Sequence, residues 1–99
     1  MTVTVVVRAR LKSEPSEIQR IHDSVTGATK EMAQQAGDVS HRTFLDPANH
    51  REFLGIDVWA SSEAFQRFSG DPKIQELFGQ MFEGMPDVTL WEDSGWNAW

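Results

Sequence analysis

The feature that most limits how this chain can fold is an apolar run, Phe53-Leu-Gly-Ile-Asp57-Val-Trp59, that passes directly into the helix start Ala60-Ser-Ser-Glu63. Side chains alternate between the two faces of a strand, so Asp57 and Trp59 share one face with Phe53, and the opposite face is aliphatic. Both faces are therefore expected to be mostly buried. Because an unpaired buried carboxylate is costly, we expect Asp57 either to be paired or to line a wet pocket.

The remaining elements follow from residue type and spacing. The predicted order is a strand over 2–11, a helix over 14–36, a hairpin of strands over 39–45 and 52–59, two helical segments separated by Gly70-Asp-Pro72, and a strand over 87–92. The apolar stripe of the first helix is expected at Ile18, Ile21, Val25, Ala28, Met32 and Ala36, with a helix stop at Gly37. The stripe of the last helix is expected at Ile74, Leu77, Phe78, Met81, Phe82 and Met85, ending at Gly84-Met-Pro86. Ser61 or Ser62, and then Asp71, are the expected helix caps.

The order β-α-β-β-α-β predicts an α+β fold of the ferredoxin-like, split β-α-β type, in which helices cover one face of an antiparallel sheet. Residues 1–99 are expected to form a single domain. Two helices cannot cover both apolar faces of such a sheet. A second copy of the chain is the simplest cover for the bare face, so the sequence predicts a homodimer.

Composition excludes several classes of function. A formal net charge of −6 with scattered basic residues argues against nucleic acid as a partner. The chain has no cysteine, hence no disulfide, thiolate nucleophile or thiolate metal site. The apolar start, Met1 to Val7, is too short for a signal peptide and reads as a strand, and no segment is long enough to span a membrane. The expectation is a cytoplasmic protein without a membrane partner.

Several of these features together resemble a known family. They are the element order, the acid two residues before Trp59, the Ser-Ser-Glu63 helix start, the break at Gly70-Asp-Pro72 and the apolar helix behind it. This combination is similar to the antibiotic biosynthesis monooxygenase family of dimeric α/β barrels. The resemblance implies that two protomers pack sheet against sheet and that each encloses a pocket between its sheet and helices. It also implies oxidation of quinol-like or polyphenolic aromatics with O₂, often with no metal or flavin cofactor.

The chain departs from this family pattern at two places. Many members carry Glu at the position of Asp57, a change that keeps the charge. Many also carry a histidine near the position of Phe68, and residues 60–99 contain none. The related haem-degrading branch is disfavoured because its axial ligand comes from that helix and its asparagine in the first strand is missing here. Loss of the helix histidine also weakens any claim of catalysis.

The candidate catalytic residues are His41 and Asp57. If Leu45 pairs with Phe53 in the hairpin, the same register places His41 opposite Asp57 and Val39 opposite Trp59, all on one face. A histidine oriented by a carboxylate can act as a general base, taking a proton from a phenol or hydroquinone so that the anion can pass an electron to O₂. The alternative, weighed equally, is a cross-strand polar pair without a chemical role.

The candidate substrate-binding residues are aromatic. Trp59 would stack on an aromatic ring, and the other wall residues would be Phe53, Phe65, Phe68 and Phe78. If these side chains fill the space themselves, a second class of function is preferred, namely a non-catalytic dimeric barrel that binds a hydrophobic ligand or only dimerises.

Other candidates receive less weight. His22 is expected at a helix surface or boundary and His50 in an exposed loop, and the histidine spacing argues against a metal site. Arg8 and Arg10 could hold a substrate oxyanion, but surface or interface arginines are the preferred interpretation. The tail tryptophans, Trp96 and Trp99, are expected to pack on the partner or over the pocket mouth.

Overall fold

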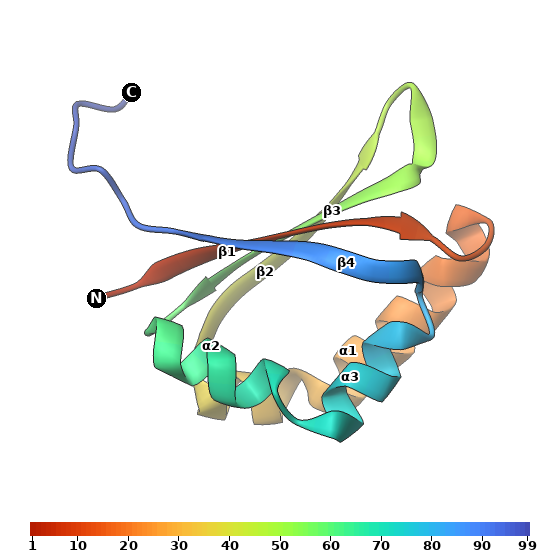
Figure 1. Cartoon of the computed structure of the whole chain (residues 1–99), viewed down its shortest axis with the longest axis horizontal. Helices are drawn as coiled ribbons and strands as arrows, with labels where there is room; N and C mark the ends of the chain where they lie inside the picture. The colour runs from red at the N-terminus through yellow and green to blue at the C-terminus, as the bar shows by residue number, and fades with distance from the viewer.

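The computed structural model describes residues 1–99, and it has a four-stranded antiparallel sheet with all helices on one face (Figure 1). The strands lie in the order β2-β3-β1-β4. The elements are β1 (Val3–Leu11), α1 (Pro15–Ala36), β2 (Asp38–Asp46), β3 (Asn49–Trp59), α2 (Ser62–Ser69), α3 (Pro72–Gly79) and β4 (Phe82–Trp91). This is the ferredoxin-like α+β fold that the element order predicts.

The helix ends form where the sequence places their signals. The Ser61 side chain accepts a hydrogen bond from the backbone N–H of Ala64, and the Asp71 side chain accepts one from Lys73. Gly37 ends α1 with a φ of 122°, in the region that favours glycine. A Cβ at Gly37 would also lie 3.2 Å from the Cβ of Ala64, so the glycine lets the end of α1 approach α2 closely.

The hairpin register agrees with the sequence prediction at two of the three pairs named above. Leu45 lies opposite Phe53, and His41 lies opposite Asp57. The prediction that Val39 pairs with Trp59 is wrong, because a bulge between Asp38 and Ser40 places Asp38 opposite Trp59 instead. The extra residue turns the start of β2 and brings a second carboxylate toward Asp57.

The apolar stripe of α1 differs from the prediction in its second half. Ile18 and Val25 are buried as expected, but Thr29 and Ala33 continue the buried stripe, while Met32 remains 45% exposed. The predicted positions Ala28 and Ala36 are exposed as well. Thr29 can be buried because its hydroxyl donates a hydrogen bond to the carbonyl of Val25. A search for apolar residues alone passes over such a position.

The predicted last helix is too long. It ends at Gly79, and Phe82 already begins β4, where it pairs with Leu11. The backbone N–H of Lys12 donates to the carbonyl of Met81 at 2.8 Å, so pairing with β1 extends the sheet into this segment. Met85 is consequently not part of a helix stripe and is 94% exposed. Tertiary pairing with β1 overrides the helical spacing of these residues.

Two small core clusters hold the helices to the sheet. One contains Val3, Val5, Trp59 and Ala64, and the other contains Leu11, Ile18, Met81 and Phe82. They lie on the helix side of the sheet, with alternate residues of β1 pointing inward. No helix of the structure is both long and apolar enough to cross a membrane.

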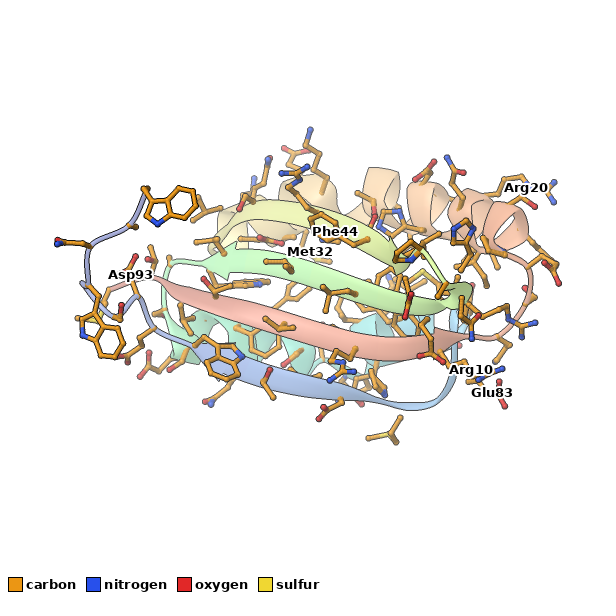
Figure 2. All side chains as sticks on the ribbon, turned by 90° about the horizontal axis from the view of Figure 1, so that it is seen from above. Arg10, Arg20, Met32, Phe44, Glu83 and Asp93 are labelled. Atoms are coloured by element: carbon orange, nitrogen blue, oxygen red, sulfur yellow. The ribbon has the colours of Figure 1, made fainter.

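The opposite face of the sheet is bare, and Figure 2 looks onto it. Strand pairing places Val6, Ile56 and Thr89 side by side on this face, with Phe44 of β2 40% exposed and Trp91 of β4 60% exposed. At one end Arg10 lies between Glu52 and Glu83, at 3.4 and 3.5 Å (Figure 2).

Candidate functional site

A cavity of about 760 Å³ lies between the sheet and the helix layer. Its wall includes members of both core clusters, so the cavity occupies the space between them. This volume lies within the range of pockets that hold small organic ligands. Apolar side chains make up much of the wall, and the polar groups gather where α1 faces β2 and β3.

His41 and Asp57 meet at this wall. His41 Nδ1 and Asp57 Oδ1 lie 2.7 Å apart, a short distance that is typical of a charge-assisted hydrogen bond. Both side chains are partly buried, with 33% and 20% of their surface exposed. The bond to Asp57 raises the pKa of His41 above its ordinary value of 6.5, although burial of the ring opposes this. The contact that strand parity predicts is present.

The second ring nitrogen of His41 contacts His22, a residue that the sequence places at a helix boundary. The two Nε2 atoms lie 2.9 Å apart, and Nδ1 of His22 lies 3.0 Å from Asp23 Oδ1. His22 lines the cavity on the same helix face as Thr26, Thr29 and Ala33. The sequence analysis gave His22 little weight, as a residue at a helix surface or boundary. A stripe of small polar residues at three- and four-residue spacing was the signal that could have found it.

Asp38 is a second acid beside Asp57, and the sequence analysis did not identify it. Its Oδ1 atom is buried and has no hydrogen-bond partner. Burial, followed by the hydrogen bond and repulsion with Asp57, raises the pKa of Asp38 from 3.8 to about 8. Two neighbouring carboxyl groups cannot both be charged cheaply, so Asp38 keeps a proton near neutral pH. The bulge in β2 is what places it here, and no local sequence signal marks that bulge.

The predicted aromatic residues all line the cavity, namely Phe53, Trp59, Phe65, Phe68 and Phe78. Trp59 is only 2% exposed, because Phe65 and Phe68 pack against it at ring-centroid distances of 5.6 and 5.1 Å. Little of the indole is left for stacking on a ligand. Packing of the core is thus its main role in the isolated chain.

The other candidates lie away from the cavity. Arg8 and Arg10 are on the bare face of the sheet, paired with residues that point away from the helices. Trp96 and Trp99 are 83% and 116% exposed and do not line the cavity. The structure contains no group of three or more histidines or acids that could hold a metal ion.

The arrangement can bind a proton and orient an acidic hydroxyl group. A hydroxyl group can donate a hydrogen bond to a neutral histidine nitrogen, and the neighbouring carboxylate favours transfer of the hydroxyl proton to the ring. The cavity therefore combines room for an aromatic ring with a base at its wall.

Comparison with known proteins identifies the family of the chain. The profile of the family described as antibiotic biosynthesis monooxygenase matches residues 4–80 of the 99-residue chain. The chain belongs to this family. Among curated proteins, no sequence matches the chain significantly.

Solved structures of other proteins share the fold of this chain at low sequence identity. SnoaB, a cofactor-independent oxygenase from Streptomyces nogalater, has a TM-score of 0.74 at 22% identity, covering 93% of this chain and 92% of that one. A monooxygenase from the gene ActVA-Orf6 of Streptomyces coelicolor, solved with the ligand nanaomycin D, has a TM-score of 0.72 at 18% identity, with coverages of 97% and 90%. Rv0793 from Mycobacterium tuberculosis has a TM-score of 0.67 at 14% identity, with coverages of 99% and 100%.

Proposed function

We propose that the protein is a cofactor-independent monooxygenase acting on a hydrophobic aromatic substrate of the quinol or polyphenol type. The observation that carries this proposal is the 2.7 Å contact between His41 and Asp57 at the wall of a cavity of about 760 Å³. Membership of the antibiotic biosynthesis monooxygenase family supports the reaction class. The likeness to SnoaB, a cofactor-independent oxygenase, is in keeping with it.

In the proposed reaction His41 accepts the hydroxyl proton of the substrate while Asp57 holds its ring. The resulting aromatic anion supplies electrons to O₂, and a ring carbon forms a bond to one oxygen atom. A phenol that loses a ring hydrogen in this way gives a quinone, and the second oxygen leaves as water. The substrate is oxidised and O₂ is reduced, so no further reductant is required. Phe53, Phe65, Phe68 and Phe78 would contact the aromatic rings.

The test is O₂ uptake by the metal-free protein with a series of hydroquinones and polyphenols. His41→Ala is expected to lower turnover by about 10²-fold or more, the usual contribution of a general base. His50→Ala is the matched control, because His50 is exposed and does not line the cavity. Turnover that is unchanged in His41→Ala would contradict the proposed base.

A non-catalytic ligand-binding barrel is the second candidate function. It is favoured by one observation, that both ring nitrogens of His41 already contact protein groups. Under this alternative an aromatic ligand binds and quenches tryptophan fluorescence, but no O₂ is consumed with any compound of the series.

We further propose that the protein is a homodimer whose protomers pack through the bare sheet face. The partly buried aliphatic row of Leu54, Ile56 and Val58, together with exposed Phe44 and Trp91, supports this interface. Specific interfaces bury at least about 1,000 Å² in total. Light scattering at micromolar concentration is expected to report twice the chain mass, and a monomer would overturn the proposal.

A further inference from the structure

The contact between His22 and His41 is unusual because two imidazole rings meet nitrogen to nitrogen. Each ring also has a carboxylate on its far nitrogen, Asp23 for His22 and Asp57 for His41. The four side chains form a row from the cavity wall to the surface of α1, where Asp23 is 63% exposed. The role of His41 as a general base, proposed above, does not require His22. The contact between the two histidines therefore needs a separate explanation.

The ring geometry identifies what lies between the two Nε2 atoms. The ring centroids are 5.2 Å apart, the planes differ by 18°, and the nitrogens are 2.9 Å apart. These values describe two nearly coplanar rings that point at each other edge to edge. A nitrogen to nitrogen distance of 2.9 Å matches an N–H···N hydrogen bond, and it is too short for a metal ion between two opposed nitrogens, each of which would need about 2 Å to the metal. One proton fits this gap.

A count of protons shows which charge state of the pair satisfies every contact in the row. Each of the three contacts in the row, Asp23 to His22, His22 to His41 and His41 to Asp57, needs one N–H. Two neutral imidazoles carry only two such hydrogens, so a neutral pair always leaves one contact without a proton. All three bonds form only when the pair is singly protonated. The flanking carboxylates favour this cation, consistent with the raised pKa of His41.

We propose that His22 and His41 together form a trap for one proton, which takes the hydroxyl proton of a phenolic or enolic ligand and leaves the ligand bound as its anion. The neutral pair has two N–H hydrogens for three contacts, so one contact always lacks a proton, which is unfavourable. The ligand O–H bond breaks, its proton is taken up by the histidine pair, and the ligand oxygen keeps the electron pair. Nδ1 of His22 can then release a proton to Asp23 and to water. This inference rests on the proposed function, whose substrate class it narrows to acidic hydroxyl compounds.

The charged groups around the pair come from three elements. Asp23 and Lys30 lie on α1, Asp38 on β2 and Asp57 on β3, and all except Asp23 line the cavity with the two histidines. Since Asp38 retains a proton near neutral pH, two carboxylates, those of Asp23 and Asp57, face one imidazolium once the pair has taken up a proton. A bound anion would lie beside that imidazolium, with Lys30 as the other cation of the cavity wall.

The first test needs no turnover. Nitrogen-resolved NMR of the imidazoles should show His22 and His41 holding one proton jointly, and His22→Gln should lower the pKa at which His41 titrates. His50→Gln is the matched control and should leave that titration unchanged, because His50 lies outside the cavity. The proposal would be overturned if the two histidines titrate independently, with the titration of each unchanged by substitution of the other. It would also be overturned if the wild-type protein binds Zn²⁺ and His22→Gln does not.

The second test uses 4-nitrophenol, whose anion absorbs differently from the neutral form. Wild-type protein should bind it as the anion at a pH where the free compound is mostly neutral, and His22→Gln should bind it mostly neutral, a loss of about 10-fold or more in the bound anion fraction. The proposal would be overturned if the wild-type protein binds 4-nitrophenol in its neutral form. If anion binding is found but no O₂ is consumed with any aromatic, the monooxygenase function fails and the trap stands.

Discussion

Replacing Asp38 with asparagine should stabilise the protein at neutral and alkaline pH. The carboxyl group of Asp38 has a pKa of about 8 in the folded chain, against 3.8 as the ordinary value. The folded state therefore binds a proton that the unfolded state releases between these two pH values. Stability is lost as pH rises through this window, since the folded protein must either keep the proton or charge a buried group.

The magnitude follows from the size of the shift. A shift from 3.8 to about 8 corresponds to about 6 kcal/mol at most, at about 1.4 kcal/mol for each pH unit. Asp38 is only half-buried, and solvent screening reduces this strongly. A buried polar atom without a hydrogen-bond partner, such as Oδ1 of Asp38, lowers the free energy of unfolding by about 1–3 kcal/mol. Asparagine is neutral at every pH and its amide can donate to Asp57, so Asp38→Asn should gain about this amount at pH 8.

Urea denaturation at pH 5, 6, 7 and 8 measures the effect. The free energy of unfolding of the wild type should fall relative to Asp38→Asn as pH rises, with equal m-values. Asp87→Asn is the matched control, because Asp87 is exposed and its side chain makes no hydrogen bond. If Asp38→Asn follows the same pH dependence as the wild type, or is less stable at pH 8, the account of this carboxyl group is wrong.

Three further predictions concern the core, the interface and the tail. Trp59→Ala should lower the free energy of unfolding by about 3–5 kcal/mol in thermal or urea denaturation, because the indole is 2% exposed and packs on two phenylalanines, whereas a Trp59 that only binds ligand would leave stability unchanged. Ile56→Asp should convert the expected dimer to a monomer in light scattering, since a charge at the centre of an apolar interface would be buried unpaired. Deleting residues 94–99 should weaken dimerisation or ligand affinity if the exposed Trp96 and Trp99 pack on a partner, and measurements that leave both unchanged would show a merely loose tail.

The strand contacts of the candidate site could be read from the sequence because they depend on local rules. Strand side chains alternate with a period of two, so one correct pair, Leu45 with Phe53, also places His41 opposite Asp57. Helix ends at Gly37, Ser61 and Asp71 were equally predictable, since a cap is an interaction between neighbours in the chain. The element order then fixed the fold class.

The tertiary structure alone decided the rest of the site. The contact between His22 and His41 depends on how α1 is rotated over the sheet, which packing along its whole buried stripe determines. The end of α3 and the start of β4 depend on pairing of Phe82 with Leu11, a partner far away in the chain. The bulge that brings Asp38 beside Asp57 is likewise set by pairing between strands. Local periodicity specifies which face of its own strand or helix a residue occupies. Long-range packing sets the distance between faces of different elements. The row of proton-binding groups and the volume of the cavity depend on that distance.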